Sequence, residues 1–311
     1  MDIDLVYLWV DGSDPVWLAR KNEFLSVAPA ATGDANCKGR YENNDELKYS
    51  LRSAEKHLPW IRNIFIVTDG QIPVWLDTSN PKVRIIDHKE ILPAEALPCY
   101  NSVVLEYFLY RIPGLAEHFL YANDDMLVGA DLSPDFFFAP DGYPIVRLKR
   151  KCCGRLSHRL RMRFAKRVTV YRQTIDRAAK LIENKFGKYH TGHLHHNIDA
   201  YRKSDLREVV ENAFAPEIAA VVTNHIRDIS DIQRVLFAYH ALETGRGHLK
   251  YVDKNESLRI SLQRSDYMKY MRIYRPKLFC LNDTQYTTDE DRKRVRPFLE
   301  SLFPKTSAFE K

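Results

Sequence analysis

The sequence predicts an α/β fold: a mainly parallel sheet with helices on both faces, followed by a largely helical later half. Strand-like and helix-like segments alternate along roughly the first third of the chain, an order typical of a parallel sheet. Three of the strand-like segments also end in acidic turns. Because the carboxyl ends of parallel strands share one edge, these acidic residues are expected to converge.

The elements are predicted in order from local patterns. Residues 2–10 form an apolar run that ends at the turn-forming residues 11–15, so they are predicted as a buried first strand. A polar loop containing Gly and Ala follows, and residues 44–58 then carry apolar side chains at helical spacing. The next segments are predicted as strand, strand, helix and strand, in the order 61–70, 82–88, 101–112 and 118–125.

The later part of the chain, from about Arg155 to Thr244, is predicted to be chiefly helical. No internal repeat or low-complexity linker divides the sequence. We therefore expect a single domain over residues 1–311, with a basic helical insertion at about 150–186.

Composition narrows the class of protein. The 311 residues are 45% hydrophobic, yet no stretch approaches the roughly 18 apolar residues that span a bilayer, and the first residues lack the order of a signal peptide. We therefore expect a cytoplasmic protein, either free or peripheral at the inner membrane face. The five cysteines have no Cys-x-x-Cys spacing, which argues against a disulfide framework and a zinc site; they are Cys37, Cys99, Cys152, Cys153 and Cys280.

Positive charge is concentrated in one segment. Between Arg147 and Lys180 there are 13 Lys and Arg and one acid, Asp176, whereas the whole chain carries a net charge of +6. Apolar residues recur there near a helical period, which fits either an amphipathic helix packed on the core or an interfacial helix on anionic lipid. We expect a peripheral membrane contact over Arg155–Lys180, and no nucleic-acid binding, because no recognition motif accompanies the charge.

The triplet Asn123, Asp124 and Asp125 interrupts an apolar run. It fits either a turn or a site for a divalent cation, Mg²⁺ or Mn²⁺, which carboxylates hold together with a substrate's phosphates. Acidic residues also follow the first two strands, so the three ends together suggest a nucleotide and metal site. No Walker or Gly-x-Gly-x-x-Gly motif is present, which disfavours an ATPase or a dehydrogenase and leaves a nucleotide-sugar enzyme.

Long motifs then give the sequence a family resemblance. Three segments resemble the first two conserved regions of the Stealth family: IDLVYLWVDGSDPVW (3–17), RYENNDELKYSLRSAEKHLPWIRNIFIVTDGQIPVWL (40–76) and FLYANDDMLVGADLSPDFF (119–137). The third resembles HLHHNID (193–199) with IRDISDIQRVLFAYH (226–240), and the fourth LFCLNDTQYTTDEDRKRVRPFLESLFPKTSAFE (278–310). The family includes bacterial capsular polysaccharide phosphotransferases and the catalytic precursor of the N-acetylglucosamine-1-phosphotransferase.

The resemblance implies a Rossmann-like, nucleotide-sugar-binding sheet and a transferase. The expected reaction moves a sugar-1-phosphate, N-acetylglucosamine-1-phosphate or another hexose-1-phosphate, from a UDP-sugar to a hydroxyl of a saccharide or lipid-linked glycan acceptor. It forms a phosphodiester and releases UMP. A metal-dependent glycosyltransferase that releases UDP is the alternative, and a non-catalytic lectin or scaffold is disfavoured by the number of acidic strand ends.

The resemblance also implies site residues. The implied catalytic residues are Asp4, Glu46, Asp69, His193 and Arg227. The implied donor-binding residues are Asp11, Gly12, Arg52, Asn101, Ser102, Asn123 and Asn282, and the implied metal ligands are Asp124, Asp125 and Asp283. Arg227 would hold a phosphate oxygen, and His193 would act as a general base or as a covalent nucleophile. Motif position selects His193 over His195 and His196. The tryptophans are assigned to the core or to a pocket wall.

Overall fold

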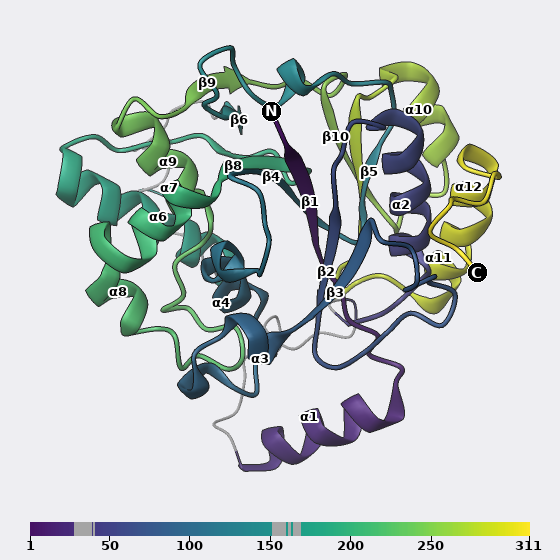
Figure 1. Ribbon diagram of the computed structural model, residues 1–311, viewed down its shortest axis with the longest axis horizontal. Coiled ribbons are helices and arrows are strands. Elements are labelled where there is room, and N and C mark those ends of the chain that lie inside the picture. The colour runs from purple at the N-terminus through teal and green to yellow at the C-terminus, as the bar shows by residue number, and fades with distance from the viewer. Residues whose placement is uncertain (28–38, 40, 151–159, 161–162, 164–168) are drawn as a thin grey trace.

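The computed structural model describes residues 1–27, 39, 41–150, 160, 163 and 169–311. Its main sheet has five strands in the order β3-β2-β1-β4-β8 (Figure 1). Their bounds are β1 Ile3–Leu8, β2 Ile64–Thr68, β3 Val83–Asp87, β4 His118–Asn123 and β8 Asp199–Arg202. Strands β1 to β4 are parallel, and β8 pairs antiparallel with β4. The predicted mainly parallel sheet is therefore confirmed.

Two three-stranded sheets flank the main one. One has the order β10-β11-β5, with bounds β10 Ser257–Ser261, β11 Leu278–Asn282 and β5 Met126–Val128. The other has the order β7-β6-β9, with bounds β7 His193–Leu194, β6 Ile145–Lys149 and β9 His248–Tyr251. Strand β5 follows β4 after the turn at Asp124 and Asp125 but pairs with β11 instead. The acidic dipeptide therefore lies where the chain leaves the main sheet for a second one.

Helices cover both faces of the main sheet, as predicted (Figure 1). Their bounds are α1 Pro15–Val27, α2 Glu46–His57, α3 His88–Ile91, α4 Ser102–Tyr107, α6 Val170–Phe186, α7 Lys203–Glu208, α8 Ala215–Ala219, α9 Val235–Glu243, α10 Tyr267–Tyr274, α11 Asp289–Lys293 and α12 Val295–Leu302. In Figure 1, α2 lies on one side of the main sheet with α10 and α12, and α4 lies on the other side with α6 to α9.

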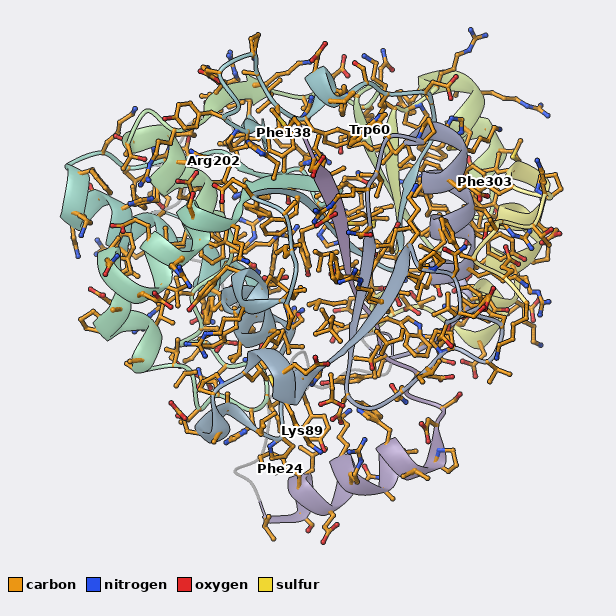
Figure 2. All side chains as sticks on the ribbon, viewed as in Figure 1. Phe24, Trp60, Lys89, Phe138, Arg202 and Phe303 are labelled. Carbon is orange, nitrogen blue, oxygen red and sulfur yellow. The ribbon has the colours of Figure 1, made fainter. Side chains whose placement is uncertain are left out.

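Strand β1 explains why the sheet is covered on both faces. Its six residues are all buried, and successive side chains point to opposite faces. Val6 packs in the core cluster that contains α4, α6 and α9, whereas Leu5 and Tyr7 pack in the cluster that contains α2. An apolar run without polar alternation is typical of such a strand. Figure 2 shows the side chains that fill the space between the sheet and its helices.

One prediction from the sequence was wrong, and the predicted largely helical later part is confirmed but contains two short strands. Helix α1 occupies part of the predicted polar loop; only Trp17 and Lys21 of its residues are buried, so its apolar side chains give no clear helical face. Strands β7 and β8 interrupt the region predicted to be helical. Strand β8 exists because it adds to the edge of β4, a contact between segments about 80 residues apart that local periodicity does not encode.

The described part of the basic segment packs on the core. Helix α6 begins after Thr169, whose side chain accepts a hydrogen bond from the backbone N–H of Arg172, and ends at Gly187, which has a φ of 75°. Its residues Ile175 and Ile182 are buried. Residues 151–159, 161–162 and 164–168, which include six of the 13 Lys and Arg between Arg147 and Lys180, lie outside the described residues. Among the described residues no helix is long and apolar enough to cross a bilayer.

Candidate active site

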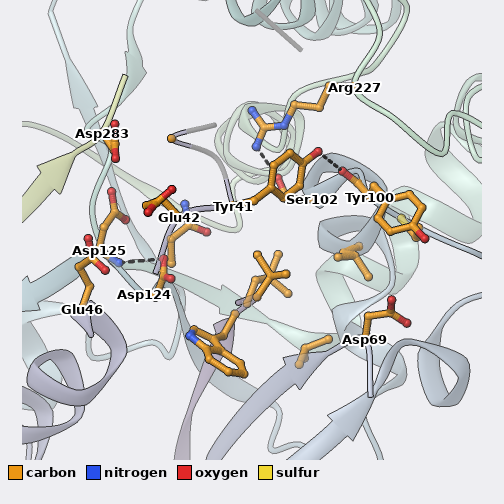
Figure 3. Close-up of a pocket in the computed structure, with 18 of the residues that line it drawn as sticks. Tyr41, Glu42, Glu46, Asp69, Tyr100, Ser102, Asp124, Asp125, Arg227 and Asp283 are labelled. Atoms are coloured by element: carbon orange, nitrogen blue, oxygen red, sulfur yellow. Dashed lines mark hydrogen bonds between the residues drawn. The ribbon is translucent and has the colours of Figure 1, made fainter. Parts of the chain in front are cut away.

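A cavity of about 240 Å³ opens at the carboxyl ends of β1, β2 and β4 (Figure 3). The strand order reverses beside β1, where β2 lies on one side and β4 on the other, and open α/β sheets bind ligands at such a point. Nine of the predicted site residues line this cavity: Glu46, Asp69, Ser102, Asn123, Asp124, Asp125, Arg227, Asn282 and Asp283. The predicted convergence of acidic strand ends is thus confirmed for β2 and β4.

Carboxylates gather on one side of the cavity. Asp124 and Asp125 form the turn between β4 and β5, Glu46 is the first residue of α2, and Asp283 directly follows β11. Figure 3 shows Glu46, Asp124 and Asp125 close together, with Asp283 nearby. Residues far apart in the sequence therefore place several acids around one small volume.

Burial and mutual repulsion disfavour the ionised forms of these acids. Burial raises the pKa of Asp124 well above its ordinary value, and the charges of Glu46 and Asp125 raise it further. Burial also raises the pKa of Asp125 to about 6 and that of Glu46 to about 7. A cation held between these groups would relieve both effects, because it would offset their negative charge.

The hydrogen bonds of Asp125 also fit a cation. Its Oδ2 accepts a hydrogen bond from the Cys280 thiol, with 3.1 Å between oxygen and sulfur. Its Oδ1 is buried and accepts no hydrogen bond from any residue that the structure describes. A buried carboxylate oxygen without a donor is costly unless a cation contacts it. The carboxylates of this side therefore fit a divalent metal.

Asp283 is held by a cation of the protein itself. Arg292 donates to it through Nε and Nη2, at 2.7 and 3.1 Å. This two-point pairing fixes the carboxylate at the cavity edge. Asp283 is therefore positioned beside the acidic cluster with its charge already largely compensated.

Arg227 brings positive charge to another side of the cavity (Figure 3). Its guanidinium donates a hydrogen bond to the hydroxyl of Ser102, which is the first residue of α4. Asn101 caps that helix by accepting a hydrogen bond from the Val103 N–H, and its amide nitrogen lies 2.9 Å from Asp231 Oδ2. A guanidinium anchored in this way suits the oxygens of a phosphate.

Asp69 stands apart from the acidic cluster. It follows β2, and its Oδ2 lies 3.2 Å from Nη2 of Arg20, a residue of α1. His88 also lines the cavity, and burial lowers its pKa to about 4, so its imidazole is neutral at physiological pH. This side of the cavity therefore offers a carboxylate and a neutral imidazole away from the acidic cluster.

Aromatic side chains form the remaining wall. Trp9, Trp17, Tyr41 and Tyr100 line the cavity, and the ring centroids of Trp17 and Tyr41 lie 5.4 Å apart. Phe24 extends from α1 toward the body of the molecule (Figure 2), where its ring centroid lies 5.7 Å from that of Tyr100. These rings hold α1 against the cavity and offer flat apolar surfaces to a base or a sugar.

Comparison with known proteins identifies the family. Three models match the chain: Stealth protein conserved region 1 at residues 1–26, conserved region 2 at 40–146 and conserved region 4 at 271–311. Together they cover more than half of the 311 residues. The chain belongs to the Stealth family.

Curated relatives agree with this assignment. The exopolysaccharide phosphotransferase CpsY of Mycobacterium tuberculosis is 37% identical over 326 residues, which cover 100% of this chain and 58% of CpsY. The capsular polysaccharide phosphotransferase SacB of Neisseria meningitidis serogroup A is 33% identical over 325 residues, which cover 100% of this chain and 57% of SacB. The chain thus spans less than two thirds of the length of these relatives.

Among solved structures, the chain is similar to the galactosyltransferase LgtC in complex with donor and acceptor sugar analogues. That similarity has a TM-score of 0.48 and 11% sequence identity, and it covers 98% of this chain and 96% of LgtC.

The Stealth regions contribute unequally to the cavity. Conserved region 2 supplies Glu46, Asp69, Asp124 and Asp125, and conserved region 4 supplies Asp283.

Six predicted residues do not line the cavity: Asp4, Asp11, Gly12, Arg52, Asn101 and His193.

Asp4 lies at the opposite end of β1 from the cavity. Its carboxylate accepts hydrogen bonds from Arg62 Nε and Nη2, at 2.9 and 2.7 Å, and from the backbone N–H groups of Asn63 and Ala116. These four donors account for its complete burial. Asp4 therefore joins β1 to the segments before β2 and β4, and we leave it out of the active site.

Arg52 lies on the face of α2 that contacts the C-terminal segment. It donates two hydrogen bonds to Glu310, at 2.7 and 2.9 Å, and one to the carbonyl oxygen of Phe303. These contacts hold the end of the Stealth conserved region 4 against α2, so Arg52 is also outside the site.

Asp11 and Gly12 shape the loop after β1 instead of lining the cavity. Asp11 accepts hydrogen bonds from Ser13 and from the side chain of Asn43. The Gly12 N–H donates to the carbonyl oxygen of Tyr41 at 2.7 Å, and a Cβ at Gly12 would lie 2.3 Å from that oxygen. Gly12 therefore permits the close approach that places Tyr41 in the cavity wall.

The structure places His196, and not His193, in the cavity lining. His193 lies in β7, and His195 is buried with its ring nitrogens against Ser257 and Asp199. Burial lowers the pKa of His196 to about 3. Sequence reasoning missed His196 because the motif offers three neighbouring histidines, and only the backbone turn between β7 and β8 decides which one reaches the cavity.

Proposed function

We propose that this chain transfers a sugar-1-phosphate from a UDP-sugar to a hydroxyl of a saccharide or lipid-linked glycan acceptor, forming a phosphodiester and releasing UMP. The observation that carries this proposal is the cavity itself, which combines a buried acidic cluster with Arg227 at the carboxyl ends of parallel strands. The names of CpsY and SacB, both phosphotransferases, support it. Capsular or exopolysaccharide synthesis is the proposed setting.

Each side of the cavity has a role in this reaction. Asp124, Asp125 and Glu46 would hold Mg²⁺ or Mn²⁺, which when bound neutralises the diphosphate of the donor. Arg227, fixed by Ser102, holds a non-bridging oxygen of the phosphate that is transferred. Asp69, on the other side, would accept the proton of the acceptor hydroxyl. Such catalysis is mostly positioning and charge neutralisation.

The leaving nucleotide separates this function from that of a glycosyltransferase. If the acceptor hydroxyl attacks the phosphorus that carries the sugar, UMP leaves and the phosphate travels with the sugar. If it attacks the anomeric carbon, UDP leaves and no phosphodiester forms.

We expect UMP when the protein is incubated with UDP-N-acetylglucosamine, a divalent cation and a capsule-type saccharide. The nucleotides are resolved by chromatography, and the acceptor mass should increase by a sugar plus a phosphate. UDP as the first uridine product, with no phosphate added to the acceptor, would overturn the proposal in favour of a glycosyltransferase.

A further inference from the structure

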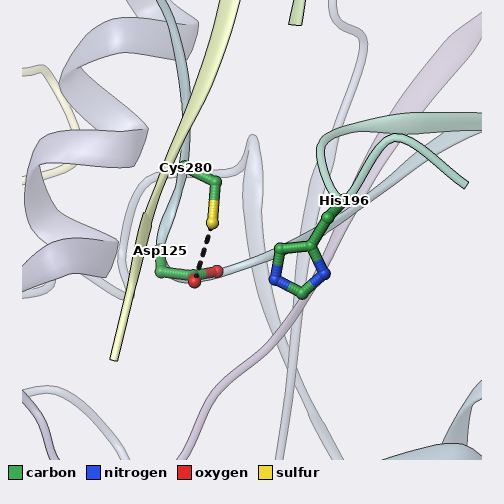
Figure 4. A group of neighbouring side chains, drawn as sticks. All are labelled: Asp125, His196 and Cys280. Atoms are coloured by element: carbon green, nitrogen blue, oxygen red, sulfur yellow. Dashed lines mark hydrogen bonds between the residues drawn. The ribbon is translucent and has the colours of Figure 1, made fainter. Parts of the chain in front are cut away.

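Three different metal-binding groups meet in the active-site region. Asp125 offers a carboxylate oxygen, His196 an imidazole nitrogen and Cys280 a sulfur, and these atoms all lie within 4.8 Å of one another (Figure 4). The three residues come from the β4–β5 turn, the β7–β8 turn and β11. Three donors from three separate elements around one point suit a metal ion, because its ligands must surround it.

The backbone fixes Asp125 and Cys280 beside each other. Cys280 stands opposite Met126 in the antiparallel pairing of β11 with β5. The Leu281 N–H donates to the carbonyl oxygen of Asp125 at 3.1 Å, and the Cys280 thiol donates to Asp125 Oδ2. Because Oδ1 is buried and receives no hydrogen bond from any described residue, it is left for another partner.

His196 is directed to the same point by an unusual backbone conformation. Its φ of 58° lies in the left-handed region, which is uncommon for a histidine. Its neighbours hold this turn in place, since His195 Nδ1 and Asn197 Nδ2 each lie 2.8 Å from the Ser257 hydroxyl. A strained residue held by buried hydrogen bonds on both sides is typical of a functional site.

We propose that Asp125, His196 and Cys280 form a site for a borderline divalent cation of the zinc class, with Cys280 bound as a thiolate. Thiolate and imidazole ligands favour such cations, whereas Mg²⁺ favours oxygen ligands alone. Binding replaces the S–H bond with a sulfur–metal bond and releases one proton to water; no electrons are exchanged. The Cys-x-x-Cys rule missed this site because its ligands are assembled by the fold.

This site rests on the proposed function and deepens it, because the region that would hold Mg²⁺ for the transferase would also bind a second class of cation. Asp125 belongs both to this trio and to the cluster of oxygen ligands with Asp124 and Glu46. A zinc-class ion bound to the trio therefore competes with Mg²⁺ for Asp125. We expect Mg²⁺ to displace it poorly, because Mg²⁺ gains little from the sulfur and the imidazole.

Cobalt(II) titration tests the site directly, because Co²⁺ bound to a thiolate gives a charge-transfer band in the near ultraviolet. The protein is first freed of metal with a chelator. We expect the band to saturate with Co²⁺, to disappear when Zn²⁺ is added, and to survive an excess of Mg²⁺. Loss of the band on adding Mg²⁺ would overturn the proposed selectivity.

The variant Cys280→Ser should lose this band, and Cys99→Ser is its matched control. Cys99 lines the cavity and is buried like Cys280, but its Sγ lies 3.4 Å from the carbonyl oxygen of Asn101 and is not part of the trio. Subtracting the Cys280→Ser spectrum removes any signal from the remaining cysteines. Equal bands in wild type and Cys280→Ser would overturn the site.

A second variant keeps the proposal testable if Cys280→Ser does not fold. His196→Asn preserves the turn, because Asn tolerates a positive φ, and removes the imidazole. We expect it to lower Co²⁺ affinity by at least roughly 10–100-fold, because removing a ligand costs no less than removing a residue that only supports a ligand. Unchanged affinity would contradict the role of His196. Neither measurement uses a sugar donor, so its failure is distinguishable from failure of the proposed transferase reaction.

Discussion

At the scale of single residues, the cavity is set by acids that the fold buries against one another. Glu46 is 4% exposed and accepts hydrogen bonds from the backbone and side-chain nitrogens of Asn44, both at 2.7 Å. These bonds favour its ionised form, but burial outweighs them and its pKa rises to about 7. Burying these acids against one another therefore costs stability in the metal-free fold.

This cost predicts a pH dependence of stability. Between pH 4.5 and about 7 the folded protein keeps a proton on Glu46 that the unfolded chain has lost, so stability falls as pH rises through this window. Relative to Glu46→Gln, which does not titrate, metal-free wild type should lose on the order of 1–3 kcal/mol between pH 5 and pH 8. Urea denaturation in the presence of a chelator, at both pH values, measures the free energy of unfolding of the two proteins. A difference between the two proteins that does not change with pH would contradict this origin.

The acidic turn predicts dependence on a divalent cation. Excess chelator should stop product formation by wild type, and added Mg²⁺ or Mn²⁺ should restore it. Asp124→Asn should lower turnover roughly 100- to 1000-fold, because a charge that positions the cation and diphosphate is removed. Asp77→Asn is the control, since Asp77 does not line the cavity and its carboxylate accepts a hydrogen bond from the backbone N–H of Ser79. Full activity of wild type in chelator would exclude the metal role.

At the scale of elements, a buried ionic network joins α9 to the main sheet. Arg234, the residue before α9, lies 3.2 Å from Glu106 of α4 and 3.0 Å from Asp199 of β8. Asp199 also contacts His195 at 3.0 Å, and the Tyr121 hydroxyl lies 2.9 Å from Glu106. The network thus supports the turn that carries His196 on one side and the end of β4 on the other.

Removing Arg234, the cation of this network, should destabilise the protein. Arg234→Met leaves two carboxylates buried without their cation, and we expect a loss of about 3–5 kcal/mol in the free energy of unfolding. Arg296→Met is the matched control, because its pair with Asp45 is 3.5 Å long and its side chain is 67% exposed, so its loss should be about 0–1 kcal/mol. Urea denaturation compares them. Similar losses in the two variants would mean that the network is not a structural centre.

At the scale of the whole molecule, the Stealth regions come together at one edge of a parallel sheet. The C-terminal region packs on α2 through Arg52 and Glu310, and the pairing of its strand β11 with β5 brings Cys280 to the β4–β5 turn. That residues 1–311 form one catalytic domain stays a prediction. The basic segment is the feature that this arrangement does not use, since the described part of it packs α6 on the core.

We propose that the basic segment contacts an anionic membrane surface through its charge. Replacing Arg159, Arg163, Lys166 and Arg167 by Gln should weaken sedimentation with anionic vesicles, and salt should weaken the binding of wild type. The control replaces four exposed basic residues elsewhere, Lys89, Lys269, Arg272 and Lys305, so that net charge changes equally. Equal binding by both variants would assign any membrane affinity to net charge alone.

The sequence by itself determined the parallel sheet, the acidic ends of its strands and the family. Apolar runs of strand length, helical spacing and turn residues are local signals, and they located β1 to β4, α2 and α4. They also placed Asp69, Asp124 and Asp125 at one edge, because parallel strands end together. These conclusions needed no knowledge of which strands are neighbours.

Only the tertiary structure decided which polar residues reach the cavity. The family resemblance implied catalytic roles for both Asp4 and Asp69, but Asp4 contacts Arg62 at the end of β1 that is far from the cavity. His193 and His196 share one motif, and the left-handed turn at His196 selects the second. Cys280 meets Asp125 across 155 residues through the pairing of β11 with β5. Such choices depend on strand register and turn conformation, which long-range packing sets and local sequence does not.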